Sequence, residues 1–268
     1  MYMHNIGIHK RYLIIILFFV VIVVTTIFIA KEGFPKDLLI ISPTPLSLSP
    51  SREKLAFVTV EKTDPKLTGT IKIVNTDGSN LQQITVTAGF IEGSLAWSSD
   101  NKKIAFSVIN NETKTIHIHT VDVQSLMDKE VTTNDNKDLS AKWSPDGNRI
   151  CFVRIKDLRH KNNLPKDLSY QTNLWLANID SSQEEQLTTI NNVYPLSWDW
   201  GRDGKRVFFL VTEGNLTEVW SVNIQTRKEE KVYSLKGWED GACFISCSPN
   251  GGNILFFWQS LDIVKGNL

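Results

Sequence analysis

Residues 143–152 read Trp143-Ser144-Pro145-Asp146-Gly147-Asn148-Arg149-Ile150-Cys151-Phe152, and the pattern of this stretch occurs five times in the chain. Each copy places an aliphatic residue seven positions after its start and a phenylalanine two positions further on. The starts are separated by 49, 46, 57 and 47 residues and lie at Leu48, Trp97, Trp143, Trp200 and Cys247. A period of this length indicates similar β units that follow one another along the chain.

The middle of each copy has the chemistry of a tight turn. In the third copy Pro145 presets φ at the first central turn position, Asp146 tolerates the second, and Gly147 accepts a positive φ. Three of the five copies keep Asp-Gly or Asn-Gly at this point, the strongest short signal for a hairpin. The residue that starts each copy and the Ile-x-Phe that follows the turn are therefore predicted to lie on two paired strands.

Two further columns follow each hairpin. A third strand is predicted from alternating, β-branched segments over residues 71–77, 116–122, 174–180 and 219–225. A fourth strand is predicted from short endings at Ile84-Thr85, Val131-Thr132, Leu187-Thr188 and Val232-Tyr233. Four antiparallel strands per unit, repeated radially, form the blade of a β-propeller.

These residues also carry a resemblance. The chain resembles the TolB-type, WD-repeat-like β-propellers, whose repeats contain Trp-Ser-Pro-Asp-Gly, Ile-x-Phe and a later Asp-Gly near the third strand. The corresponding residues here are Trp143 to Gly147, Ile150 to Phe152, and Asp77-Gly78. The resemblance covers residues 46–268 and implies an all-β fold of about five four-stranded blades. It does not imply one function, because such propellers serve as scaffolds, binding modules and enzyme subdomains.

The last blade is expected to be incomplete. In the second and fourth copies the end of the third strand comes 16 residues after the phenylalanine, and from Phe256 that position would lie beyond Leu268. Two interpretations follow. Either residues 38–42 supply the missing outer strand and close a five-bladed ring, or the chain is a shortened six-bladed ring with an open edge.

The N-terminal part predicts a membrane anchor. Residues 13–30 form an uncharged, mostly apolar run preceded by Lys10 and Arg11, long enough to cross a bilayer as one helix. The predicted organisation is a cytoplasmic tail over 1–12, a transmembrane helix or signal anchor over 13–30, a stalk over 31–45, and an extracytoplasmic propeller over 46–268. The alternative is a cleaved signal, with Phe28-Ile29-Ala30 as its cleavage site and a secreted or periplasmic product.

Charge and motifs exclude several classes of function. Lys plus Arg and Asp plus Glu are both 29, so no net basic field indicates nucleic acid as a partner. There is no Gly-x-Ser-x-Gly elbow, no glycine-rich phosphate loop and no His-Glu-x-x-His, so we expect no catalytic residues and no cofactor.

His117 and His119 share a strand face, but no third ligand accompanies them, and no metal site is predicted. Cys151, Cys243 and Cys247 are expected to be buried small hydrophobes, although a disulfide between two of them stays open.

One connection departs from the repeat. The chain advances 22 positions from Phe152 to Leu174, against 10 in the second and fourth copies and 14 in the first, so the third blade carries an insertion between its second and third strands. Insertions of this kind map to loops on one face, often the binding face. The insertion is basic and supplies our predicted partner-binding residues, Arg154, Lys156, Arg159, His160, Lys161 and Lys166. The alternative is a solvated loop without a partner.

The sequence as a whole predicts a single-pass membrane protein whose extracytoplasmic propeller binds protein partners and catalyses no reaction. Two alternatives from other classes remain open at this point: a ligand- or metal-binding propeller of an enzyme, either a lyase or a peptidase-associated domain, and a sensor domain.

Overall fold

The computed structural model describes residues 46–63, 66–85, 90–110, 112–157, 170–181, 183–213, 216–235, 241–248 and 253–260. The chain divides into two units, Met1–Ile40 and Ile41–Leu268, and every described strand belongs to the second. The apolar segment 13–30 and the candidate strand 38–42 lie outside the described residues. Within the described part, no helix has the length and hydrophobicity needed to span a bilayer.

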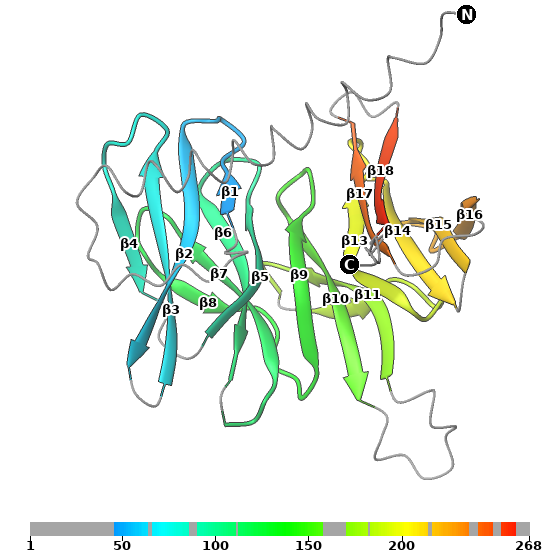
Figure 1. The fold of residues 1–268 in the computed structure, drawn as a ribbon, viewed down its shortest axis with the longest axis horizontal. Coiled ribbons are helices and arrows are strands. Elements are labelled where there is room, and N and C mark those ends of the chain that lie inside the picture. Colours follow the sequence, from blue (N-terminus) through cyan, green and yellow to red (C-terminus); the bar gives the residue numbers. More distant parts are fainter. Residues whose placement is uncertain are drawn as a thin grey trace, which may run out of the picture. The chain divides into compact units, whose positions relative to one another are not determined.

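The described strands follow the predicted order of four per repeat (Figure 1). The first repeat comprises β1 (Leu46–Leu48), β2 (Lys54–Thr63), β3 (Lys66–Asn75) and β4 (Gln82–Thr85). The second comprises β5 (Phe90–Trp97), β6 (Lys103–Ile109), β7 (Ile116–Asp122) and β8 (Asp128–Glu130). The third comprises β9 (Lys137–Trp143), β10 (Arg149–Asp157), β11 (Tyr170–Asn178) and β12 (Glu184–Gln186). The fourth comprises β13 (Val193–Trp200), β14 (Arg206–Glu213), β15 (Leu216–Asn223) and β16 (Glu229–Leu235), and the fifth β17 (Gly241–Cys247) and β18 (Ile254–Ser260).

Each repeat forms one antiparallel blade in which the strands pair in chain order. One parallel bridge, between Ile116 and Lys137, additionally links the second blade to the third. The first strands of successive blades contact one another, which makes them the inner strands of the blades. In the fifth blade the described strands are β17 and β18, and residues 261–268, where a third strand would lie, are outside the described residues.

The predicted hairpin register is confirmed in all five copies. The residue that starts each copy lies opposite the aliphatic residue seven positions later, in the pairs Leu48–Leu55, Trp97–Ile104, Trp143–Ile150, Trp200–Val207 and Cys247–Ile254. The fourth strands differ in part from the prediction. β8 and β12 are only three residues long and end just before Val131-Thr132 and Leu187-Thr188. Thr132 and Thr188 instead bind the interior of the third strand with their side chains, since their Oγ1 atoms accept hydrogen bonds from Ile118 N and Leu174 N.

The turn between the first two strands is closed by a repeated serine. Ser144 Oγ accepts a hydrogen bond from Arg149 N at 3.0 Å and donates one to Asp146 Oδ1 at 2.5 Å. Gly147 then takes a left-handed φ of 73°. Ser98 and Asp100 reproduce this arrangement in the second blade, with an oxygen–oxygen distance of 2.6 Å. The Ser-Pro-Asp-Gly motif therefore fixes the turn through side-chain hydrogen bonds as well as through backbone conformation.

Successive blades are joined by an indole hydrogen bond between their inner strands. Trp97 Nε1 donates to Ser47 O at 3.0 Å, Trp143 Nε1 to Ala96 O at 3.1 Å, and Trp200 Nε1 to Lys142 O at 3.3 Å. In each case the acceptor is the residue just before the equivalent position of the preceding blade. All three tryptophans are only 6–7% exposed, so this repeat position is buried in each of the three blades. Each bond connects two blades and removes a polar N–H from the apolar layer between them.

Cys247 replaces this tryptophan in the fifth blade, so the hydrogen bond between the fourth and fifth blades differs from the others. Its backbone N donates to Asp199 Oδ2 at 2.9 Å. The acceptor in the fourth blade is thus a side-chain carboxylate, whereas the tryptophans of the other blades donate to a backbone carbonyl. Burial, followed by the Asp199 charge, raises the pKa of the Cys247 thiol to about 11. Cys151 is fully buried, and both of these cysteines are free thiols. The side chain of Cys243 is outside the described residues.

Candidate functional site

The predicted insertion lies between β10 and β11 of the third blade. The connection spans residues 158–169, whereas the equivalent connections span 64–65, 110–115 and 214–215. It is shorter than predicted at its first end, because β10 continues to Asp157 and includes Arg154 and Lys156 as strand residues. The alternation of these residues with Val153 and Ile155 keeps the apolar face of the strand intact up to that point.

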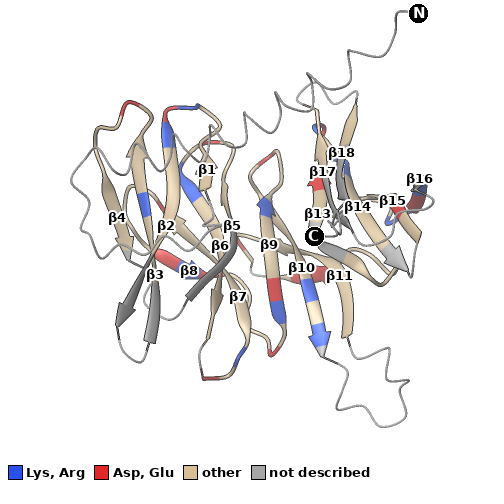
Figure 2. Cartoon of the chain, in the orientation of Figure 1, with Lys and Arg blue, Asp and Glu red and all other residues tan. Residues whose placement is uncertain are grey.

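Arg154 holds a buried ion network where the insertion begins. It is 3% exposed, and its Nε and Nη2 donate to Asp138 Oδ1 and Oδ2 at 2.7 and 2.8 Å. Nη2 also donates to Glu184 Oε2 at 2.5 Å. Figure 2 shows the basic residues of β10 beside the acidic segment of β9. The guanidinium therefore cross-links β9, β10 and β12 of one blade.

This network is specific to the third blade. The positions equivalent to Arg154 are Thr59, Val108 and Val211, all uncharged. Burial acts to lower the pKa of Arg154, but the hydrogen bonds and charges of Asp138 and Glu184 outweigh it and hold that pKa above its ordinary value. The charge of Arg154, at a repeat position that is uncharged in the other blades compared, is thus compensated by carboxylates of its own blade.

Trp175 forms an aromatic platform next to this network. The Arg154 guanidinium carbon lies 4.3 Å from the centre of a Trp175 ring, and Lys156 Nζ lies 4.7 Å from it. The two cations stabilise the indole face and are held in place by it. Trp175 Nε1 is buried and has no hydrogen-bond partner among the described residues. In the sequence Trp175 is visible only as part of the predicted third strand 174–180, and no pattern there predicts its contact with the two cations.

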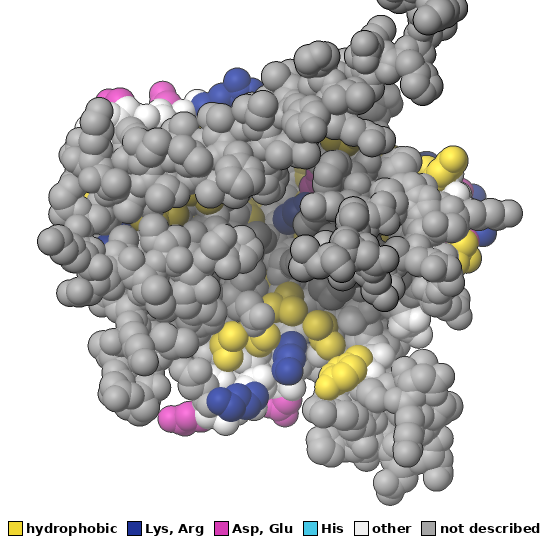
Figure 3. Space-filling model, viewed as in Figure 1, with side chains coloured by type: hydrophobic (Ala, Val, Ile, Leu, Met, Phe, Trp, Pro, Cys, Tyr) yellow, Lys and Arg dark blue, Asp and Glu magenta, His cyan; other side chains and the backbone are white. Residues whose placement is uncertain are grey.

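The structure brings together two of the six predicted site residues. Arg154 and Lys156 share one face of β10 and both contact Trp175. Arg154 is buried and its charge is used within the blade, so it positions the base of the insertion. Arg159, His160, Lys161 and Lys166 lie outside the described residues. In the face seen in Figure 3, the coloured side chains include both signs of charge interspersed with hydrophobic residues.

The two histidines of β7 pair with carboxylates. His117 Nδ1 lies 2.6 Å from Glu130 Oε1, and His117 Nε2 lies 2.7 Å from Asn134 O. His119 Nδ1 lies 3.1 Å from Asp128 Oδ1, and its ring stacks on Phe106. Among the described residues, no three His, Cys, Asp or Glu side chains are grouped as metal ligands. Both histidines therefore tie β7 to β8 within the second blade.

The repeated blades and their turn motif agree with a comparison against known families. The model of the TolB β-propeller domain matches residues 34–262. This chain belongs to the TolB β-propeller domain family. No curated protein sequence matches it.

Solved structures of TolB-type and related propellers share this fold. TolB from Acinetobacter baumannii superposes with a TM-score of 0.55 at 19% identity, over 78% of this chain and 47% of that one. Acylaminoacyl peptidase from Pyrococcus horikoshii gives 0.58 at 19% identity, over 81% of this chain and 36% of that one. An oligogalacturonate lyase in complex with manganese gives 0.58 at 16% identity, over 77% of this chain and 56% of that one.

The TolB-type fold is thus shared with proteins of different activities, and at these identities the likeness establishes the fold alone. The chain spans about half the length of the A. baumannii protein and about a third of the peptidase.

Proposed function

We propose that this chain is a membrane-anchored, extracytoplasmic TolB-type propeller that binds a protein partner and does not itself catalyse a reaction. The observation that supports this most is the 158–169 connection, which is twelve residues long where two of its three equivalents have two residues. Loops carried on a rigid scaffold supply binding residues more often than the scaffold does. A partner with an acidic surface fits the basic residues Arg159, Lys161 and Lys166 of this connection.

The base of the connection supports the same function. The ion network of Arg154 with Asp138 and Glu184 cross-links three strands of the blade, and Lys156 lies over the Trp175 ring next to it. A rigid base reduces the conformational entropy that a loop loses when it binds. Basic residues on such a loop act chiefly on the association rate and on its dependence on salt.

The membrane anchor is part of the proposal. Residues 13–30 carry no charge and follow Lys10 and Arg11, which favours retention of the preceding tail in the cytoplasm. The full-length protein should resist extraction with alkaline carbonate, and protease added outside spheroplasts should digest the propeller only. A mature N-terminus at Lys31 in a soluble extracytoplasmic fraction would show that residues 13–30 belong to a cleaved signal and not to an anchor.

Shortening the connection tests the binding site. Replacing residues 158–169 by Asn-Gly reproduces the two-residue link between β14 and β15, so the blade should fold and keep its melting temperature. Partner recovery in a pull-down from native membranes should fall about tenfold, equivalent to a loss of about 1.4 kcal/mol in binding free energy.

A matched control keeps the twelve residues but permutes their order, which conserves length and charge. If the partner recognises the sequence of the loop, recovery by this variant should lie between that of the wild type and that of the shortened variant. If the partner recognises only the net charge of the loop, recovery should equal that of the wild type. Equal recovery of the same partners by the wild type and the shortened variant would show that the connection is a solvated loop.

A further inference from the structure

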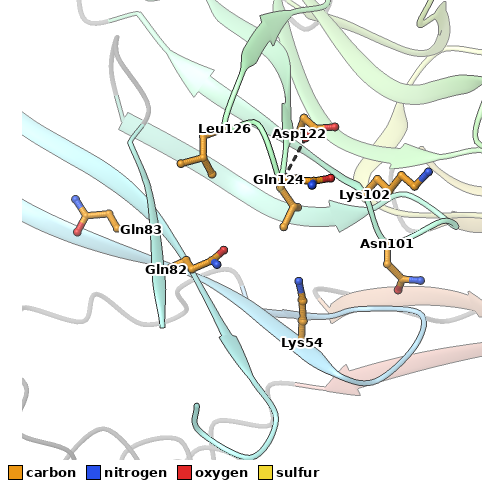
Figure 4. A pocket seen from close by; sticks show the side chains of 9 residues that line it. Lys54, Gln82, Gln83, Asn101, Lys102, Asp122, Gln124 and Leu126 are labelled. Atoms are coloured by element: carbon orange, nitrogen blue, oxygen red, sulfur yellow. Dashed lines mark hydrogen bonds between the residues drawn. The ribbon is translucent and has the colours of Figure 1, made fainter. Parts of the chain in front are cut away.

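A second feature lies at the other end of the strands, between the first and second blades. A pocket of about 620 Å³ is bordered there by residues of both blades, including Lys54, Gln82, Asn101, Lys102 and Gln124 (Figure 4). Lys54 begins β2, Gln82 begins β4, and the others come from the turns of the second blade. The pocket is thus built at a junction between repeats, at the end of the blades opposite to the 158–169 connection.

Lys54 contributes a positive charge that no described carboxylate neutralises. A cation begins the second strand of four blades, at Lys54, Lys103, Arg149 and Arg206. Lys103 lies opposite Asp122, and Arg206 lies 3.7 Å from Glu230. Lys54 lies opposite the neutral Asn75, as Arg149 lies opposite Asn178, and among the described residues no carboxylate comes within ion-pair distance of Lys54. A half-buried ammonium without a counter-charge favours an anionic ligand.

The other polar groups that line the pocket are a second ammonium, one carboxylate and four side-chain amides, from Lys102, Asp122, Gln82, Gln83, Asn101 and Gln124. Asn101 Oδ1 accepts from Ser51 N at 2.9 Å, which leaves the Nδ2 donors of Asn101 for the pocket. In Figure 4 the side chains of Lys54 and Gln82 point toward the space between them. The nearby acid, Asp122, uses Oδ1 to accept hydrogen bonds from Gln124 N, Ser125 N and Ser125 Oγ. Oδ1 of this lining carboxylate is therefore engaged within its own turn, and Lys103 lies opposite Asp122 on the neighbouring strand.

The rim of the pocket is apolar at one side. Leu126 lines the pocket, is 48% exposed and has a φ of 60°, a left-handed conformation that disfavours branched apolar residues. Arg227 takes the same conformation at the equivalent turn of the fourth blade, so a leucine is not required by the turn. Met127 and Leu81, which follow and precede lining residues, are 73% and 50% exposed. An exposed leucine at the rim offers an apolar surface that a ligand in the pocket can contact.

We propose that this pocket binds an oxyanion, a phosphate or carboxylate group, whose attached apolar part lies against Leu126. Lys54 supplies the charge, and the amides of Asn101 and Gln82 supply neutral donors that fix the oxygen atoms. The oxyanion can come from a free metabolite or from a lipid headgroup, and both present the same chemistry to the pocket. The site is independent of the proposed partner-binding connection.

Titration of the full-length protein in a non-ionic detergent, at constant ionic strength, tests this proposal. The probes are inorganic phosphate and hexyl phosphate, which share the oxyanion and differ in the apolar part. Both should bind saturably, and Lys54→Gln should weaken both by about tenfold, the effect of losing one charge-assisted hydrogen bond. Arg149→Gln is the matched control, because Arg149 holds the equivalent position in the third blade, also lies opposite an asparagine, and does not line the pocket. Its affinity should equal that of wild type.

The two sources of the oxyanion give different outcomes. Tighter binding of hexyl phosphate, reduced to the level of inorganic phosphate by Leu126→Ser, identifies a ligand with an apolar part such as a lipid. Equal binding of the two probes overturns the apolar contact with Leu126 and leaves the oxyanion alone as the ligand. The proposal is overturned if neither probe binds saturably, or if Arg149→Gln weakens binding as much as Lys54→Gln does. Melting curves of each variant without ligand confirm that the compared proteins are folded.

Discussion

Replacing Trp143 by alanine should lower the free energy of unfolding by about 3–5 kcal/mol, the range for a buried large aromatic. The indole is 7% exposed and packs with Ala105, Ile118 and Phe152 in the layer between the second and third blades. Its Nε1 also donates to Ala96 O, so the substitution removes a hydrogen bond between blades as well as apolar area. The loss should appear as a lower melting temperature by circular dichroism.

Trp143→Phe is the matched control for this experiment. It keeps an aromatic ring opposite Ile150 and removes the N–H donor, so it should cost less than Trp143→Ala. The difference between the two variants separates packing from the hydrogen bond, for which we expect about 1 kcal/mol. An unchanged melting curve for Trp143→Ala would show that the repeat alignment does not describe the packing of the blades.

Replacing Asp138 by alanine should destabilise the chain by about 3–5 kcal/mol, because it leaves the buried Arg154 guanidinium without its bidentate partner. Asp138 is fully buried and accepts hydrogen bonds from Arg154 at 2.7 and 2.8 Å and from Asn134 Nδ2 at 3.1 Å. Glu184 still accepts one hydrogen bond from Arg154, but it is partly exposed and contacts only Nη2. Urea unfolding of the full-length protein measures the change.

The double variant Asp138→Leu with Arg154→Met is the control. It removes both charges and restores apolar packing, so it should recover most of the lost stability. If Asp138→Ala lies within about 1 kcal/mol of wild type, the network does not brace the blade, and the rigid base of the connection would lose its support.

The fold was largely predictable because the repeat specifies its own register. Trp143, Gly147 and Ile150 define a turn of fixed length, and the pairs observed across all five hairpins follow from it. The bounds of β8 and β12 were not predictable in this way. Their ends depend on Thr132 and Thr188, whose hydroxyls bond to the neighbouring strand rather than extending their own.

The candidate site was predictable only in part. The length and charge of the insertion are visible in the sequence, and so is the unusual arginine at position 154. Its partner Asp138 is not, because the pairing of β9 with β10 contains a register shift between Cys151 and Val153. Glu184 lies 30 residues away on the outer strand of the blade. The pocket beside Lys54 carries no motif, since side chains of two repeats form it.

Site-specific photo-crosslinking in native membranes tests the proposed function most directly. A photoreactive amino acid at position 160, inside the connection, should give a discrete adduct with a partner protein. The same amino acid at Asp180, an exposed residue at the other end of the third blade, serves as the control and should give no such adduct. Adducts of the same mass from both positions, or from position 180 only, would contradict a binding site on the 158–169 connection.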